Sequence, residues 1–119
     1  WSLVDIMLAS KTPIHTYSTG YADSCGFFIF IAGTERYITK HTRMILHQIS
    51  SGTRGIYQCM KEHMKELDKD WAECEEYILA QTKITREDLD DMKERKIDWH
   101  IRSDESIKLG VATDIIAKF

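Results

Sequence analysis

The chain has 119 residues, of which 43% are hydrophobic, and carries a formal net charge of −3 at pH 7. This length can bury one hydrophobic core and gives no sign of a second domain. The acidic balance argues against an electrostatic nucleic-acid footprint. No apolar run approaches the roughly 20 residues that a membrane-spanning helix needs. We therefore expect one domain that has neither a nucleic acid nor a membrane as its partner.

The first predicted elements alternate between strands and helices. A helix over residues 3–9 is stopped at Pro13, and a β-like stretch over 14–19 leads into an apolar helix over 27–32. Two strands follow at 35–39 and 44–48, before a Gly/Ser-rich loop at 50–55. After a long helix, the pattern predicts a short helix over 85–93, one from Ser103 to Gly110, and a last strand over 111–116. Strands that alternate with helices indicate a layered α/β domain.

The long helix runs from about Ile56 to Gln81 and carries one apolar stripe. Its stripe residues recur at three- and four-residue steps: Ile56, Met60, His63, Met64, Leu67, Trp71, Cys74 and Ile78. Lysine, glutamate and aspartate occupy the other face. The stripe can pack against the chain's own core or face a partner. We favour the partner, because helices this long often project from a small domain.

Two shorter helices downstream carry cap signals. Thr85 and Asp88 resemble a capping box, and Ser103 is the expected cap of the helix that Gly110 ends.

The cysteines are odd in number and lack metal-ligand spacing. Cys25, Cys59 and Cys74 make three, and the last two fall on the long helix. We expect these two to be small buried hydrophobes rather than a disulfide, which suits a reducing, cytoplasmic compartment. We expect no metal and no cofactor in this chain.

Ser24 is the first candidate for chemistry. It lies in the run Gly20-Tyr21-Ala22-Asp23-Ser24-Cys25-Gly26, between the β-like stretch and the apolar helix. A strand-to-helix turn exposes a nucleophilic hydroxyl and points the next amide, that of Cys25, toward a developing oxyanion. A serine beside glycines is also common in ordinary turns, so this segment alone is weak evidence.

His47 and Asp98 are the second and third candidates. His47 stands at the far end of a buried strand in Arg43-Met44-Ile45-Leu46-His47-Gln48, and a backbone carbonyl partner is its simplest alternative role. Asp98 is set among apolar residues of a short strand, where a carboxylate is costly unless paired. Its alternative is an exposed acid at a strand edge.

These motifs, in this order, resemble the proteolytic subunit of the Clp protease (the ClpP family) in the Clp/crotonase superfamily. The family pattern G-x-A-x-S-x-G and the later A-G match Gly20, Ala22, Ser24, Gly26 and Ala32-Gly33. R-x-M-x-H-Q is similar to Arg43 through Gln48, with one extra residue before the histidine or a local shift. The family's third pattern, an aspartate followed by S-A-x-E-A-x-x-x-G-L-x-D, is similar to Asp98 through Asp114. The likeness covers nearly the whole chain. It departs from the family at Ile49, where a proline is usual.

The resemblance implies a ClpP/crotonase-like layered α/β fold, with residues of about 54–82 as the handle helix that joins two rings. It further implies a serine endopeptidase with Ser24 as nucleophile, His47 as general base, Asp98 as the acid and the Cys25 amide as one oxyanion donor. Its substrates would be unfolded polypeptides, held extended around residues 48–53. The implied partners are further copies of the chain in stacked rings and an AAA+ unfoldase, which uses the ATP.

The start of the chain resembles the family's mid-chain helix, so we expect an N-terminal part to be missing, with the Gly-Gly turn that supplies a second oxyanion donor. This leaves a non-catalytic ClpP-like subunit as one alternative. A crotonase-type acyl-CoA enzyme is another, although it would not need the three residues in this order. A signal-peptide peptidase would use a Ser-Lys pair and a membrane anchor, and neither is evident.

Overall fold

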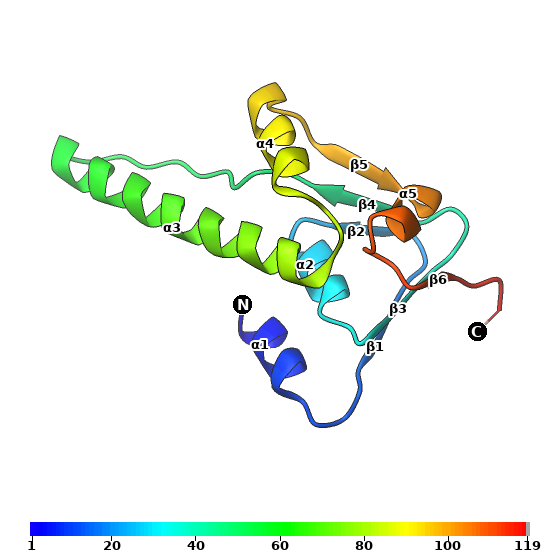
Figure 1. The fold of residues 1–119 in the computed structure, drawn as a ribbon. Coiled ribbons are helices and arrows are strands. Elements are labelled where there is room, and N and C mark those ends of the chain that lie inside the picture. Colours follow the sequence, from blue (N-terminus) through cyan, green and yellow to red (C-terminus); the bar gives the residue numbers. More distant parts are fainter. Residues whose placement is uncertain (119) are drawn as a thin grey trace.

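Two three-stranded sheets form the centre of the computed structural model, which describes residues 1–118 (Figure 1). The first sheet has the order β1 (His15–Ser18), β3 (Glu35–Ile38), β6 (Asp114–Ile115), and its strands are parallel. The second has the order β2 (Tyr21–Asp23), β4 (Arg43–Leu46), β5 (Trp99–Arg102), with β5 antiparallel to β4. The last strand is shorter than the predicted 111–116. β1 leads directly into β2, and β3 leads directly into β4, so the chain passes twice from the first sheet to the second.

Five helices surround these sheets in the described part of the chain. They are α1 (Ser2–Ala9), α2 (Cys25–Ile31), α3 (Tyr57–Gln81), α4 (Arg86–Arg95) and α5 (Ser103–Lys108). The layered α/β fold predicted from the sequence is confirmed. The long helix begins at Tyr57, three residues later than the expected start of the handle, because Ile56 still has an extended backbone.

The core is built around α2, whose sequence is apolar throughout. Phe27, Phe30 and Ile31 of this helix are at most 3% exposed. Figure 1 shows α2 between the sheets and the C-terminal part of α3. The three side chains belong to one core cluster with residues such as Met44 and Ile78. Fully burying each such side chain contributes about 1.5–3 kcal/mol. Burial of this apolar run holds α2 in place, and with it the turn that precedes the helix.

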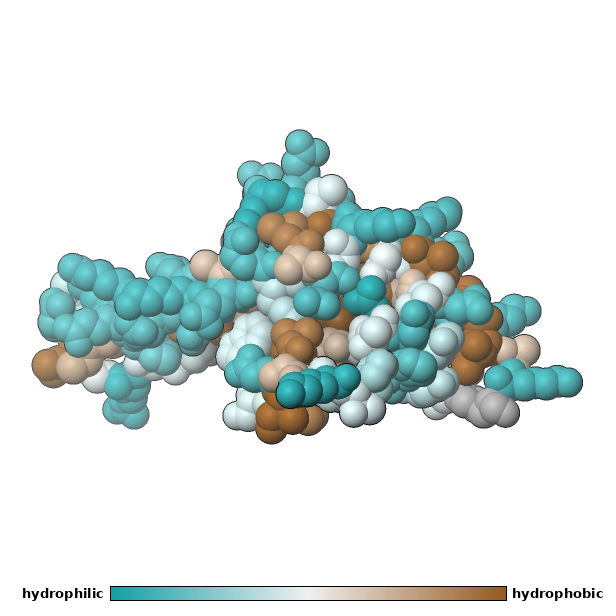
Figure 2. All heavy atoms as spheres, turned by 60° about the horizontal axis from the view of Figure 1, so that its bottom comes forward, coloured by the Kyte–Doolittle hydropathy of each residue, from teal (hydrophilic) through white to brown (hydrophobic). Residues whose placement is uncertain are grey.

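Only the C-terminal half of α3 packs against this core. Figure 1 shows the N-terminal half extending away from the other helices, with the segment between β4 and α3 running beside it. Figure 2 shows this projection as mainly hydrophilic, with hydrophobic atoms at its outer end. Tyr57 is 71% exposed and Met64 is 54% exposed, whereas Trp71 is half-buried against the core and Ile78 is fully buried. The apolar stripe thus divides into a core-packing part and an exposed part.

Of the predicted helix caps, two are confirmed and one is wrong. Thr85 and Asp88 form the expected reciprocal capping box of α4. Gly110 follows α5 with φ of 63°, a conformation that glycine adopts without strain. Ser103 does not cap α5, since it is the first helical residue and its hydroxyl donates to the carbonyl of Lys40 at 2.5 Å.

Arg36 on β3 joins the C-terminal ends of three helices. Its guanidinium donates to the carbonyl oxygens of Ile31 at 3.0 Å, Gln81 at 2.7 Å and Gly110 at 3.0 Å. A cation is favourable there because helix C-termini carry partial negative charge and unpaired carbonyls. Burial lowers the pKa of Arg36 below its ordinary value. The three carbonyls hold α2, α3 and α5 around a single side chain.

Candidate active site

Ser24 occupies the turn between β2 and α2 with a strained backbone. Its φ is 52° and its ψ is −115°, outside the regions that non-glycine residues normally adopt. Its amide donates to the carbonyl of Ile45 on β4 at 3.0 Å. The predicted strand-to-helix turn is confirmed, and Cys25 is the first residue of the helix, where amides have no partner within the helix. Such strain costs about 1–3 kcal/mol and tends to occur where function requires it.

His47 is the residue after β4, and its side chain is half-buried. Its Nδ1 lies 2.8 Å from the carbonyl oxygen of Gln48. Because a carbonyl can only accept, this contact favours the neutral tautomer that has its proton on Nδ1 and leaves Nε2 as an acceptor. This is the tautomer that a general base facing a hydroxyl requires. The carbonyl partner anticipated as the simpler role of this histidine is also present.

Asp98 lies just before β5 rather than within a strand, and it is exposed. The sequence interpretation that placed it inside an apolar strand was wrong, because β5 begins only at Trp99. The β4–β5 register pairs Leu46 with Trp99. Asp98 and His47 are therefore at adjacent positions, one step beyond this pair on neighbouring strands.

The three candidates meet at one edge of the second sheet. Ser24 follows β2, His47 follows the neighbouring parallel strand β4, and Asp98 precedes the antiparallel β5. Ser24 and His47 line one cavity of about 420 Å³, and His47 and Asp98 line another of about 380 Å³. Within residues 1–118 no hydrogen bond links the side chains of these three residues. The strand order therefore places the three residues at the same edge of the sheet, but their side chains are not hydrogen-bonded to one another.

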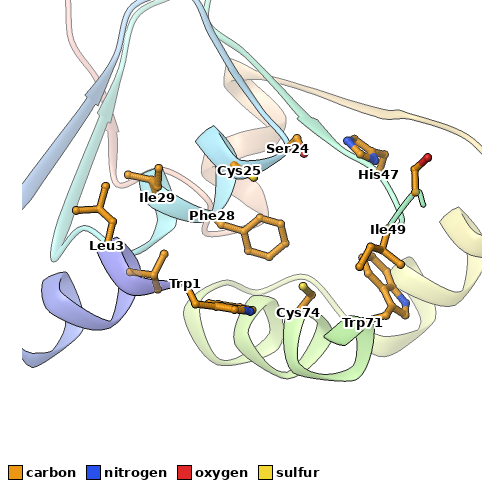
Figure 3. Close-up of a pocket in the computed structure, with 12 residues that line it drawn as sticks. Trp1, Leu3, Ser24, Cys25, Phe28, Ile29, His47, Ile49, Trp71 and Cys74 are labelled. Carbon is orange, nitrogen blue, oxygen red and sulfur yellow. The ribbon is translucent and has the colours of Figure 1, made fainter. Parts of the chain in front are cut away.

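The cavity beside Ser24 is mostly apolar (Figure 3). Its walls are formed chiefly by Trp1, Phe28, Ile49, Trp71 and Cys74. Figure 3 shows Ser24 and His47 at one side of this space and Trp1 and Cys74 at the other. Sequence reasoning missed the cavity because its walls come from α1, α2, α3 and the segment after β4, and no spacing pattern connects them.

One of the two thiols on α3 lies differently from what the sequence predicted. Cys59 is exposed on the projecting half of α3, so its expected burial was wrong. Cys74 is half-buried in the cavity wall, where burial raises the pKa of its thiol. Cys25 is exposed beside Ser24 and lines the same cavity.

An aromatic cluster supports one wall of the cavity. Trp1 lies edge-on to Phe28 and to Tyr77, with ring centroids 5.8 Å and 5.3 Å apart, and Phe28 stacks on Tyr77 at 6.0 Å. The Tyr77 hydroxyl donates to the Phe28 carbonyl at 2.9 Å. Burial raises the pKa of Tyr77 to about 12. The cluster ties α2 to α3 behind the turn that carries Ser24.

Among residues 1–118 there is no group of three or more histidine, cysteine, aspartate or glutamate side chains arranged to hold a metal ion. The described helices also include none with the length and apolar character to cross a membrane.

Comparison with known sequences assigns the chain to a family. The sequence model of the Clp protease family matches residues 1–119. The chain belongs to the Clp protease family. It is 23% identical over 120 residues to the ATP-dependent Clp protease proteolytic subunit 2 of Treponema pallidum (strain Nichols). The alignment covers 99% of this chain and 59% of that relative, so the chain spans less than two-thirds of the relative's length.

Proposed function

We propose that the natural protein containing these residues is a serine endopeptidase that cleaves unfolded polypeptides or peptides. The observation that carries the proposal is the strained turn of Ser24, which opens on the same cavity as His47. Membership in the Clp protease family and the name of the relative, a proteolytic subunit, support the reaction class.

In the proposed mechanism, Nε2 of His47 takes the proton of Ser24 as its Oγ attacks the peptide carbonyl. The amide of Cys25 donates to the oxyanion of the tetrahedral intermediate. His47 then protonates the leaving amine, and water hydrolyses the acyl-enzyme by the same steps in reverse order. Asp98 stabilises the imidazolium from its position just before β5, the strand next to β4.

The apolar cavity suggests how a substrate is held. Its aromatic and aliphatic walls would accept an apolar side chain next to the scissile bond. The segment after His47, around residues 48–53, has no regular secondary structure and offers backbone groups for strand-like pairing with a polypeptide. Pairing through the backbone would give weak sequence preference.

The assembly is part of the same proposal. The exposed half of α3 would contact further copies of the chain in stacked rings, and the rings would keep folded proteins from Ser24. An AAA+ unfoldase would deliver substrate and use the ATP, which leaves this subunit without a cofactor. The words "ATP-dependent" and "subunit" in the relative's name support this arrangement.

The test is the adjacent pair of variants Ser24→Ala and Cys25→Ala in the natural protein. Ser24→Ala should abolish fluorophosphonate labelling and reduce peptide hydrolysis by several orders of magnitude. Cys25→Ala keeps the backbone amide and should leave labelling intact. Hydrolysis that survives in Ser24→Ala would reject the serine mechanism. Loss of activity only in Cys25→Ala would assign the chemistry to the thiol.

One observation favours a second candidate, a non-catalytic subunit that only builds the assembly. His47 is held by the Gln48 carbonyl, and no hydrogen bond between described side chains joins it to Ser24 or Asp98. This candidate predicts rings of normal size without fluorophosphonate labelling. A crotonase-type enzyme, which would bind acyl-CoA, has no comparable observation in its favour.

A further inference from the structure

Glu75 on α3 is a buried carboxylate that contacts two cations. Its side chain is almost fully buried, with the residue 6% exposed. Arg86 Nη1 donates to Oε2 at 2.8 Å, and Lys93 Nζ forms an ion pair with Oε1 at 2.7 Å. The carboxylate in turn raises the pKa of Lys93. A carboxylate this buried is tolerated because charged partners compensate for its lost hydration.

The two cations fix both ends of α4 to α3. Arg86 is the first residue of α4, and Lys93 lies in its last turn. A single ion pair would leave the helix free to pivot, whereas contacts at both ends set its direction. Leu89 and Met92, buried between these ends, pack against the core on the same side.

Asp98 lies in the short link between the end of α4 and the start of β5, so both elements hold its backbone. Lys96 ends the helix in the left-handed region, with φ of 53° and ψ of 44°, and the amide of Ile97 donates to the Met92 carbonyl at 3.4 Å. One residue beyond Asp98, Trp99 enters the ladder opposite Leu46. Asp98 is therefore a short link between the end of α4 and the strand beside His47. Its own side chain makes no hydrogen bond to any described residue.

We propose that Glu75 is a positioning residue for Asp98. By fixing α4 at both ends, it sets the distance of the Asp98 carboxylate from the His47 ring. The inference rests on the serine-peptidase function proposed above, and it assigns to α3 a second role besides forming one wall of the cavity.

The test is a double-mutant cycle between Glu75→Gln and Asp98→Asn, measured as peptide hydrolysis by the natural protein. We expect Glu75→Gln to lower kcat about 10-fold, since small misplacements of a catalytic group have effects of this size or larger. KM should stay within about 2-fold, because the cavity is unchanged. In the Asp98→Asn background, Glu75→Gln should have no further effect on kcat, since residues that act as a unit are not additive.

Glu76→Gln is the matched control. Glu76 is the next residue, and it also accepts from Arg86, at 2.6 Å, but its side chain is 73% exposed. We expect it to keep wild-type kcat. A wild-type kcat in folded Glu75→Gln, equal losses in both glutamate variants, or multiplied losses in the double variant would each overturn the inference.

Folding of each variant is checked by circular dichroism and thermal unfolding. If Glu75→Gln does not fold, Lys93→Gln removes the same contact from a side chain that is 32% exposed, and the same cycle with Asp98→Asn decides the question. A different outcome rejects the proposed function itself, namely hydrolysis that survives in Ser24→Ala. If Ser24→Ala is inactive and Glu75→Gln is not impaired, only the positioning role is rejected.

Discussion

The Nδ1–H of His47 is held by the carbonyl oxygen of Gln48, 2.8 Å away. In a serine triad the acid normally holds this proton and thereby selects the ring tautomer. Here a neighbouring backbone group selects it, so the tautomer does not depend on Asp98.

This relationship predicts a moderate effect of Asp98→Asn. In the triad used as the general template, the corresponding substitution lowers kcat about 10⁴-fold because the ring takes the wrong tautomer. With the tautomer held by Gln48, we expect only the loss of imidazolium stabilisation, which is a fall in kcat well below 10⁴-fold, with KM unchanged. Steady-state kinetics on a fluorogenic peptide measure this. The control is Asp114→Asn, an exposed aspartate at the end of the other sheet. A 10⁴-fold loss would show that Asp98 replaces Gln48 as the partner of Nδ1.

The sequence was sufficient to predict the α/β layers, the long helix and the turn that carries Ser24. These features depend on local patterns: apolar periodicity, turn residues and the motif around Ser24. The position of Asp98 was harder to predict, because the start of β5 is set by pairing with β4 and not by the apolar residues around the acid. The cavity and the contacts of Arg36 and Glu75 join segments far apart in the chain, and no single segment signals them.

Arg36→Met should destabilise the protein strongly. The substitution keeps much of the apolar stem but leaves the carbonyls of Ile31, Gln81 and Gly110 without their donor. Leaving buried polar groups unpaired costs about 1–3 kcal/mol each, and partial access of water reduces the sum, so we expect about 3 kcal/mol. For a domain of this size that corresponds to a fall in Tm of roughly 10–20 °C.

Urea and thermal unfolding measure this effect, with Arg54→Met in the exposed loop as the control. Arg36→Lys should also destabilise, because one ammonium cannot reach three carbonyls in the fixed geometry of a guanidinium. Equal stability of wild type and Arg36→Met would show that these carbonyls find other donors.

Tyr77 should make stability fall at alkaline pH. Its pKa is raised to about 12 by burial, above the ordinary value of about 10 that it has in the unfolded chain. A folded-state pKa above the unfolded one means that the folded chain holds the phenolic proton longer. The contribution to stability is therefore complete below pH 10 and is lost as pH rises from about 10 to 12.

Tyr77→Phe should show a smaller loss of stability over this pH range than the wild type. It should also be less stable at pH 8 by about 1 kcal/mol, since the hydrogen bond to the Phe28 carbonyl is gone. Urea midpoints between pH 8 and 11 measure both effects. Tyr57→Phe, at a residue that is 71% exposed, is the control and should follow the wild type. Identical pH dependence in the two variants would contradict the assignment to Tyr77.

The exposed half of α3 is the surface on which the proposed assembly can be tested. Trp71 is unsuitable for this test, because it packs against the chain's own core and lines the cavity. Tyr57 and Met64, which are 71% and 54% exposed, can be changed without disturbing that core. Ile56, next to Tyr57, is 72% exposed as well, and contiguous exposed apolar area of this kind typically marks a contact site.

We therefore expect Tyr57→Glu combined with Met64→Glu to dissociate the natural protein into smaller species that remain folded. Burying two carboxylates in an apolar interface is costly, which favours the separated state. Sedimentation velocity at micromolar concentration measures the result. Gln58→Glu adds a charge at an exposed polar position beside Tyr57 and should leave the assembly intact. A double variant that sediments like the wild type would show that subunits associate through another surface.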